Sequence, residues 1–339
     1  MSKSAIVTGG NGFIGSYLSN ELVIRGYRVI RLIQDTPANR QTNPGQDIRF
    51  FDLAKPESMK DICEGGNVVF HLAAIPREQT NFNKEDYIQV NVNGTRCLLE
   101  EAAHAGVGRF VYVSTIEAVG PAINSVPLTE ETEPHPLNNY GKSKLEAERL
   151  VNNFHSGQMT CSVVRLPMIY GPGNYLNVPK LFGAVQRPVF PLIGNGHALM
   201  EFCFVGNAVQ GLILAGEQEK AAGEIFFISE ESRRLRDVIS AVAKAENVRP
   251  FLFVIPVPLA YILALLIEGA AVVLPFKPFR SPITHKPLFT RKTIEWTTHS
   301  VNICSAEKAA CVLGYKPPFS LEEGLRITVE DFRKREWIR

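Results

Sequence analysis

Short apolar runs alternate along the first half of the chain with longer stretches in which apolar positions recur at helical spacing. Short runs of this kind predict buried strands, and the longer stretches predict amphipathic helices. Because parallel strands need long crossover connections, the alternation predicts an α/β fold with a doubly wound parallel sheet and helices on both faces. The predicted strands are 4–8, 28–33, 67–72, 109–113 and 161–166, and the helices between most of them lie near 14–25, 85–105 and 141–155.

Beyond Arg165 the pattern changes, because prolines separated by glycines predict long loops. Two later apolar segments, Phe202–Val205 and Glu224–Ile228, are expected to be strands that return to the sheet. The remainder is mostly helical in pattern and ends in an amphipathic helix over Leu321–Phe332. We therefore expect a larger domain and a smaller, discontinuous, mostly helical one. The larger domain comprises residues 1–165 and 198–228, and the smaller one residues 166–197 and 229–339.

The segment from Leu259 to Phe276 is apolar over nearly the length that crosses a bilayer. Glu268 lies in its middle and prolines flank it, and both features weaken a spanning helix. Three interpretations stay open: a buried or lid helix of the smaller domain, a helix in the membrane interface, and a true span. A peripheral membrane contact through 259–276 is therefore one expectation.

Composition excludes several classes of function. The formal net charge is +2 and no run of basic residues is longer than the three of Arg333–Arg335, so nucleic acid is not an expected partner. The six cysteines form no CxxC pair and no histidine stands at metal-ligand spacing, so no metal site is predicted and reduced thiols are expected. The first predicted strand begins at residue 4, which leaves no room for a signal peptide, and a cytoplasmic location is expected.

A glycine-rich turn follows the first predicted strand, where Ser4–Val7 runs into the sequence TGGNGFIG at 8–15. Gly9 allows the tight turn, Gly12 lets the backbone approach a ligand, and Gly15 lets the next helix pack close to its strand. A helix N-terminus placed after such a turn presents backbone N–H groups to anions. The motif therefore predicts a site for the pyrophosphate of a dinucleotide.

Tyr140 and Lys144 form a YxxxK pair at the start of the helix predicted near 141–155, and their spacing places both side chains on one helical face. A phenol with a pKa near about 10 is a poor base at neutral pH until a cation stabilises its anion. Lowering that pKa by about three units takes about 4 kcal/mol, which is also the energy of one ion pair at about 4 Å with an effective dielectric near 20. One lysine is therefore sufficient to lower the pKa of the phenol by about three units.

A further hydroxyl is expected to hold the substrate oxygen while its proton moves. Ser114 and Thr115 stand at the carboxyl end of the strand predicted over 109–113, where such a group belongs, and we favour Thr115. The alternative is that both hydroxyls only cap the end of the strand, since Ser and Thr are common at such turns.

Several short segments carry a resemblance to a known superfamily. They are TGGNGFIG at 8–15, Phe51–Leu53, His71–Ala74, Asn91–Thr95, Val113–Thr115, YGKSK at 140–144, Arg165–Pro167 and Tyr170–Gly173. On these segments the chain resembles the extended short-chain dehydrogenases/reductases, which include NAD-dependent sugar-nucleotide epimerases, dehydratases and 3β-hydroxysteroid dehydrogenases. The resemblance covers nearly the whole chain, and it implies a Rossmann fold, oxidoreductase activity and NAD as cofactor.

The resemblance also implies roles for individual residues. Tyr140 would be the catalytic base, Lys144 its partner and a ligand of the cofactor ribose, and Thr115 the substrate-holding hydroxyl. Asn91 would be a structural bracket, and a homodimer through the two helices that flank the active-site strand is implied. The residues implied to contact the cofactor are Gly9, Gly12, Phe13, Ile14, Gly15, Asp35, Asp52, Leu53, Leu72, Ala73, Ala74, Val113, Tyr140, Lys144, Pro167 and Ile169.

Two positions bear on the substrate. Sugar-nucleotide enzymes of this superfamily usually carry an asparagine and an arginine that bind the substrate diphosphate, and Met168 and Met200 occupy those positions here. Losing charge-assisted hydrogen bonds worth about 1.5–3 kcal/mol each disfavours a nucleotide sugar. The stretch Ser114–Pro121 and the apolar run 259–276 resemble the 3β-hydroxysteroid dehydrogenase branch, so we expect an apolar, sterol-like alcohol or ketone. The expected substrate contacts are Thr115, Met168 and Met200.

Two alternatives to this function stay open. A nucleotide-sugar epimerase or dehydratase is the enzymatic alternative, and a non-catalytic cofactor-binding sensor or scaffold is the alternative of another class. Glu117 matches a glutamate that the dehydratases use, but Ile116 occupies the place of their acid, so we favour a structural carboxylate at Glu117.

The choice between NAD and NADP depends on the end of the second predicted strand. Ile33 stands where NAD-using relatives carry an aspartate that binds the ribose, so Asp35 is the candidate ribose ligand. Arg31 and Arg40 are close enough in sequence to accept a 2′-phosphate, so NADP stays open although NAD is favoured.

Overall fold

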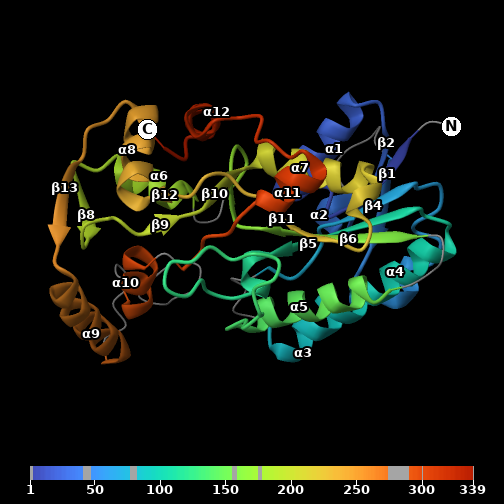
Figure 1. Cartoon of the computed structure of the whole chain (residues 1–339), viewed down its shortest axis with the longest axis horizontal. Coiled ribbons are helices and arrows are strands. Elements are labelled where there is room, and N and C mark those ends of the chain that lie inside the picture. Colours follow the sequence, from blue (N-terminus) through green and yellow to red (C-terminus); the bar gives the residue numbers. More distant parts are fainter. Residues whose placement is uncertain are drawn as a thin grey trace.

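A computed structural model describes residues 3–40, 47–76, 82–154, 159–174, 178–273, 290–299 and 301–338. A seven-stranded sheet lies at one end of the elongated chain (Figure 1). All of its neighbouring strands are parallel, which confirms the predicted doubly wound sheet. The strands run in the order β11 (Ile225–Phe227), β6 (Thr160–Leu166), β5 (Arg109–Thr115), β4 (Val68–His71), β1 (Ser4–Thr8), β2 (Arg28–Gln34) and β3 (Asp47–Phe51).

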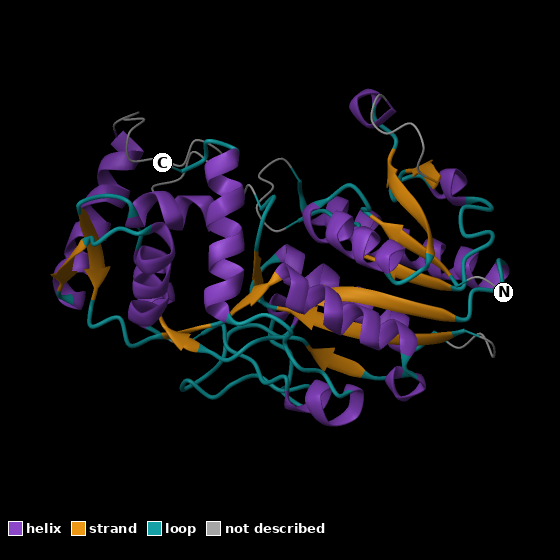
Figure 2. Cartoon of the chain, turned by 90° about the horizontal axis from the view of Figure 1, so that it is seen from above, coloured by secondary structure: helices purple, strands orange, loops and turns teal. Residues whose placement is uncertain are grey.

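Helices cover both faces of the sheet because alternate strand residues point to opposite sides. Val7 packs toward α1 (Phe13–Ile24) and α7 (Val205–Glu217), whereas Ile6 packs toward α4 (Gly94–His104) and α5 (Asn139–Asn152). Figure 1 shows these two helical layers with the sheet between them, and Figure 2, seen from above, shows helices lying across the sheet. The direction of the crossovers reverses between β1 and β4, and in doubly wound sheets ligands bind at the carboxyl ends of the strands beside such a reversal.

The seven-stranded sheet differs from the predicted one in two strands, and the short strands β7, β8, β9, β12 and β13 outside it were not predicted. Strand β3 was not predicted, because it is a half-buried edge strand whose short segment shows no clear alternation. The segment Phe202–Val205 was expected to return to the sheet, but β10 (Phe202–Phe204) instead pairs with β7 (Met168–Tyr170) in a separate two-stranded sheet. An apolar pattern identifies a strand without identifying its partner. Glu224–Ile228 does return, as β11 beside β6.

The helix predicted over 85–105 is interrupted. It consists of α3 (Lys84–Tyr87), a π-helical turn over Ile88–Asn93, and α4. Asn91 lies in that turn, where its Oδ1 accepts from Ile75 N at 2.8 Å and its Nδ2 donates to Ser143 Oγ at 3.0 Å. Its side chain therefore joins the segment after β4 to helix α5. Short helical turns elsewhere are α2 (Pro37–Arg40), Pro56–Met59, Ile116–Ala118 and Glu219–Ala221.

The other end of the molecule is built mostly from later elements. It contains a parallel pair of strands, β8 and β13, and an antiparallel pair, β9 and β12. Near the end of the chain, α11 (Glu307–Leu313) packs against β11 and α7. The boundaries of the two domains stay a prediction. The remaining bounds are α6 (Val178–Val185), β8 (Val189–Ile193), β9 (Leu199–Met200), β12 (Arg233–Arg234), α8 (Leu235–Glu246), β13 (Phe251–Ile255), α9 (Val257–Val273), α10 (Arg291–Thr298) and α12 (Leu321–Lys334).

The apolar segment 259–276 begins within helix α9, and its residues 274–276 lie outside the described part of the chain. One side of α9 is buried, since Ala260 and Ala264 pack with Ile294 of α10. Glu268 forms an ion pair with Arg291 at 2.9 Å. Among the described residues, no helix is long and apolar enough to span a membrane. The opposite side of α9 exposes Leu259, Ile262, Leu263, Leu265 and Leu266.

Candidate active site

A cavity of about 370 Å³ lies at the carboxyl ends of the central strands, beside the point where the strand order reverses. It brings together residues from the glycine-rich turn, from the ends of β4, β5 and β6, and from the first turns of α5. The sequence-predicted residues that line it are Gly9, Gly12, Phe13, Ile14, Gly15, Leu72, Ala73, Ala74, Val113, Thr115, Tyr140, Lys144, Pro167 and Ile169.

The glycine-rich turn has the geometry of an anion site. Gly9 adopts φ +65°, and Gly12 N donates to Gly9 O at 2.8 Å. A Cβ on Gly15 would overlap Gly9 O, so only glycine lets α1 begin this close to the turn. Gly12, the N-cap of α1, has no side chain that could cap the helix, and the first turn of α1 carries no acidic residue. Because Gly12, Phe13 and Ile14 line the cavity, the positive end of the helix faces it. These residues fit a pyrophosphate.

A buried network that sequence reasoning missed holds the cavity wall formed by Leu72 and Ala73. Thr8 Oγ1 accepts from both of their backbone N–H groups, at 3.0 and 2.9 Å, and contacts His71 Nδ1 at 2.8 Å. Because Thr95 Oγ1 donates to a backbone carbonyl, it accepts from His71 Nε2 at 2.9 Å, and Nδ1 therefore accepts from Thr8. Burial, with the nearby ammonium of Lys144, lowers the pKa of His71 to about 3, so the ring is neutral.

Lys144 is buried beneath the cavity. Its Nζ donates to Val113 O at 2.7 Å and lies 4.1 Å from the centre of the Tyr112 ring. Burial lowers the pKa of Lys144 to about 7, and the carboxylate of Glu148 opposes part of this shift. Tyr140, one helical turn earlier, is half-buried and lines the cavity. The expected cation is therefore present, and its burial brings its titration close to neutral pH.

The two hydroxyls at the end of β5 differ in their surroundings. Ser114 is buried and its Oγ donates to the Glu148 carboxylate, which also accepts from Arg165 Nη2 at 2.8 Å. Thr115 lines the cavity, and its Oγ1 accepts from Glu117 N at 3.3 Å. A hydroxyl that accepts one hydrogen bond still carries a proton to donate. Thr115 is therefore better placed than Ser114 to hold a substrate oxygen.

Other predicted cofactor residues lie outside the lining of this cavity. Asp35, at the end of β2, is held by Arg40 through two hydrogen bonds of 2.5 and 2.6 Å, and this partner lowers the pKa of its carboxyl. Asp52 accepts from Ala54 N at 3.0 Å, and Leu53 is buried against Gly94. The carboxylate of Asp35 and the guanidinium of Arg40 therefore form an ion pair at the end of β2.

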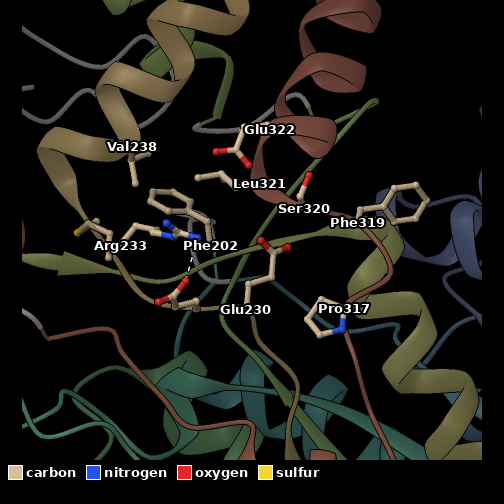
Figure 3. Close-up of a pocket in the computed structure, with 11 residues that line it drawn as sticks. Phe202, Glu230, Arg233, Val238, Pro317, Phe319, Ser320, Leu321 and Glu322 are labelled. Atoms are coloured by element: carbon tan, nitrogen blue, oxygen red, sulfur yellow. Dashed lines mark ion pairs between the residues drawn. The ribbon is translucent and has the colours of Figure 1, made fainter.

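The structure does not bring the predicted substrate contacts into one cavity. Met168 is half-buried in β7, and Met200 lies in β9 opposite Arg233 of β12. Met200 lines a second cavity of about 300 Å³, together with Phe202, Glu230 and the start of α12. Figure 3 shows Glu230 and Phe202 in this second cavity, near Ser320 and Leu321.

Comparison with known proteins agrees with this geometry. The model of the NAD dependent epimerase/dehydratase family matches residues 5–229. The chain is 30% identical over 351 residues to the decarboxylating sterol-4-alpha-carboxylate 3-dehydrogenase of Mus musculus, across 98% of this chain and 91% of that protein. It is 29% identical to 3beta-hydroxysteroid-dehydrogenase/decarboxylase isoform 1 of Arabidopsis thaliana, across 96% of this chain and 79% of that protein. These relatives confirm the resemblance to the 3β-hydroxysteroid dehydrogenase branch.

Solved structures support the same family. A UDP-glucose 4-epimerase of Thermotoga maritima, solved with UDP-glucose, matches 98% of this chain and 99% of its own, with a TM-score of 0.73 and 25% identity. The family match covers well over half of the chain, and the cofactor of the family is NAD. The chain therefore belongs to the NAD dependent epimerase/dehydratase family, as an NAD-dependent oxidoreductase of the extended short-chain dehydrogenase/reductase type.

Proposed function

We propose that this oxidoreductase transfers a hydride between NAD and a secondary alcohol or ketone of an apolar, sterol-like small molecule. One observation carries the proposal: among the described residues that line the active-site cavity, Lys144 is the only charged one. Its ammonium is hydrogen-bonded to Val113 O, and no arginine is among the described residues that line this cavity and could bind a substrate diphosphate. Met168, at a position usual for a diphosphate ligand and between the cavity-lining residues Pro167 and Ile169, supports the same substrate class.

The chain's own residues would handle the substrate oxygen and its proton. NAD, when bound, supplies a hydride acceptor at its nicotinamide ring. Thr115 donates a hydrogen bond to the substrate oxygen, and Tyr140 exchanges the proton with that oxygen. The buried ammonium of Lys144 stabilises the phenolate, and the wall held by Thr8 and His71 orients the cofactor.

The test is a comparison of substrate classes. We expect NAD-dependent oxidation of 3β-hydroxysteroids or other apolar secondary alcohols, with no turnover of UDP-glucose. Isothermal titration with UDP is expected to show no binding. Binding of UDP together with epimerisation of UDP-glucose would favour the nucleotide-sugar alternative. NAD binding without turnover of either class would favour a cofactor-binding sensor.

We further infer that the outer face of α9 and strand β13 rest on a lipid surface. A helix that packs on a protein and faces water normally carries polar residues on its outer side. In α9, Leu263 and Leu266 are 37% and 64% exposed, and in β13, Phe251 and Phe253 are 67% and 54% exposed. Exposed apolar side chains grouped in this way mark an interaction site, and burying them in the membrane interface would stabilise attachment.

Replacing Leu263 and Leu266 together with glutamate is expected to reduce binding to phospholipid vesicles by about tenfold or more, since each buried leucine contributes about 1.5–3 kcal/mol. Co-sedimentation with phosphatidylcholine vesicles containing phosphatidylserine measures the effect. Ile24→Glu is the matched control, because Ile24 is 78% exposed on α1. Equal vesicle binding by the double variant and the control would contradict the inference.

Three expectations stay predictions. They are a homodimer through α4 and α5, a cytoplasmic location, and NAD as the cofactor in preference to NADP. The Asp35–Arg40 pair bears on the last of these, because its carboxylate suits a ribose hydroxyl and its guanidinium suits a 2′-phosphate.

A further inference from the structure

A side-chain hydrogen bond joins the two ends of the loop that separates Thr115 from Tyr140. Glu117 stands two residues after Thr115, and Asn138 stands two residues before Tyr140. Asn138 Nδ2 donates to Glu117 Oε2 at 2.7 Å. Thr115 and Tyr140 both line the active-site cavity, so the bridge lies beside the two groups that would touch the substrate oxygen.

Each end of the bridge is also fixed to its own element. Thr115 Oγ1 accepts from Glu117 N, which ties Glu117 to the end of β5. Asn138 is the N-cap of α5, and its Oδ1 accepts from Gly141 N at 2.8 Å. A Cβ on Gly141 would overlap Glu117 O, so the first turn of α5 sits directly against the turn that carries Glu117.

The base of the loop is closed in a second place. His135 N donates to Val119 O at 2.6 Å. Gly120 has φ +103°, and a Cβ there would overlap His135 O. These contacts hold the loop closed, but along the chain they are farther from Thr115 and Tyr140 than Glu117 and Asn138 are. The Glu117–Asn138 bond, within two residues of each group, therefore acts on their separation, alongside the bonds from Lys144 to Val113 O and from Ser114 to Glu148 that also join α5 to β5.

We propose that Glu117 and Asn138 are positioning residues that set the distance between the Thr115 hydroxyl and the Tyr140 phenol. The inference rests on the proposed function, in which both groups bind one substrate oxygen. Reaction rates are sensitive to displacements of about 1 Å, and hydrogen bonds to a carboxylate are stronger and shorter than neutral ones. A glutamate that accepts from the N-cap of α5 would thus hold the catalytic tyrosine at a fixed distance from β5.

A double-mutant cycle tests the proposal. Glu117→Ala removes the acceptor, and Asn138→Ser removes the Nδ2 donor while keeping a residue that caps helices well. We expect each variant to lower kcat by about tenfold or more, with NADH affinity and the melting temperature nearly unchanged. The double variant is expected to be no slower than Glu117→Ala alone, because both changes break the same bond. Glu117→Gln keeps an acceptor oxygen and is expected to recover most of kcat.

Other results of the same experiment would contradict the proposal. The positioning role would be overturned if the kcat of the double variant fell by the product of the two single-variant factors. It would also be overturned if the variants lost melting temperature without losing kcat. If Glu117→Gln is as slow as Glu117→Ala and also loses a limb of the pH profile, Glu117 transfers a proton itself and the proposal is wrong. Failure of the proposed function is separable, because it would appear as wild-type inactivity toward apolar alcohols.

Discussion

Tyr140→Phe is expected to lower kcat for oxidation of an apolar alcohol by about 10³-fold, while the affinity for NADH changes little. The phenylalanine keeps the ring in the cavity but carries no group that can exchange a proton with the substrate oxygen. Positioned acid–base catalysis contributes about 10²–10⁴-fold, so the predicted loss lies within the usual range. Steady-state kinetics measure the loss, and fluorescence titration with NADH measures cofactor binding.

A second tyrosine provides the control for this variant. Tyr27 lies just before β2, its hydroxyl donates to Glu217 at 2.8 Å, and it does not line the cavity. Tyr27→Phe is expected to leave kcat unchanged. Retained activity in Tyr140→Phe would show that another group exchanges the proton, and Thr115 would then be the next candidate.

Local patterns predicted the parts of the site that lie close together in the sequence. The glycine-rich turn depends on residues 8–15 alone, and Tyr140 and Lys144 share one helical face, so their spacing was sufficient. The sequence also predicted that these segments lie close together in space, because the carboxyl ends of parallel strands lie at one edge of a sheet. The active-site cavity accordingly contains both segments together with Thr115.

Features that depend on distant partners were not predicted. His71 was part of a recognised motif, but its role depends on Thr8 and Thr95, which hydrogen-bond it from β1 and α4. The pairing of β10 with β7 likewise depends on tertiary packing, because an apolar strand can pair with any free edge. Met200 lies in a second cavity, and its position there depends on the pairing of β9 with β12.

Burial also changed the electrostatic picture of the site. From the spacing of Tyr140 and Lys144 alone, we expect Lys144 to carry a full positive charge beside the phenol. In the structure it is 2% exposed, and the resulting desolvation disfavours the ammonium. Glu148, one helical turn further along α5, supplies the compensating negative charge. The charge state of the catalytic pair thus depends on a carboxylate that no motif singled out.

Glu148→Ala is expected to lower the free energy of unfolding by about 3–5 kcal/mol, because it leaves a buried arginine without its counter-charge. Glu148 and Arg165 are 1% and 2% exposed, and their side chains meet at 2.8 Å. No described residue accepts from Arg165 Nη1, so the guanidinium has little other compensation. Ser114 would lose its acceptor as well. Urea unfolding monitored by circular dichroism measures the change as a shift of the midpoint.

An exposed ion pair and a compensated double variant serve as controls. Glu330 pairs with Arg326 at 2.7 Å on the surface of α12, and Glu330→Ala is expected to cost no more than about 1 kcal/mol. Replacing Glu148 with leucine and Arg165 with methionine together removes both buried charges, so it is expected to recover much of the stability lost in Glu148→Ala. The double variant should nevertheless stay catalytically impaired, because Lys144 no longer has the carboxylate that favours its charged form. Restored activity in that variant would show that Glu148 acts on the fold alone.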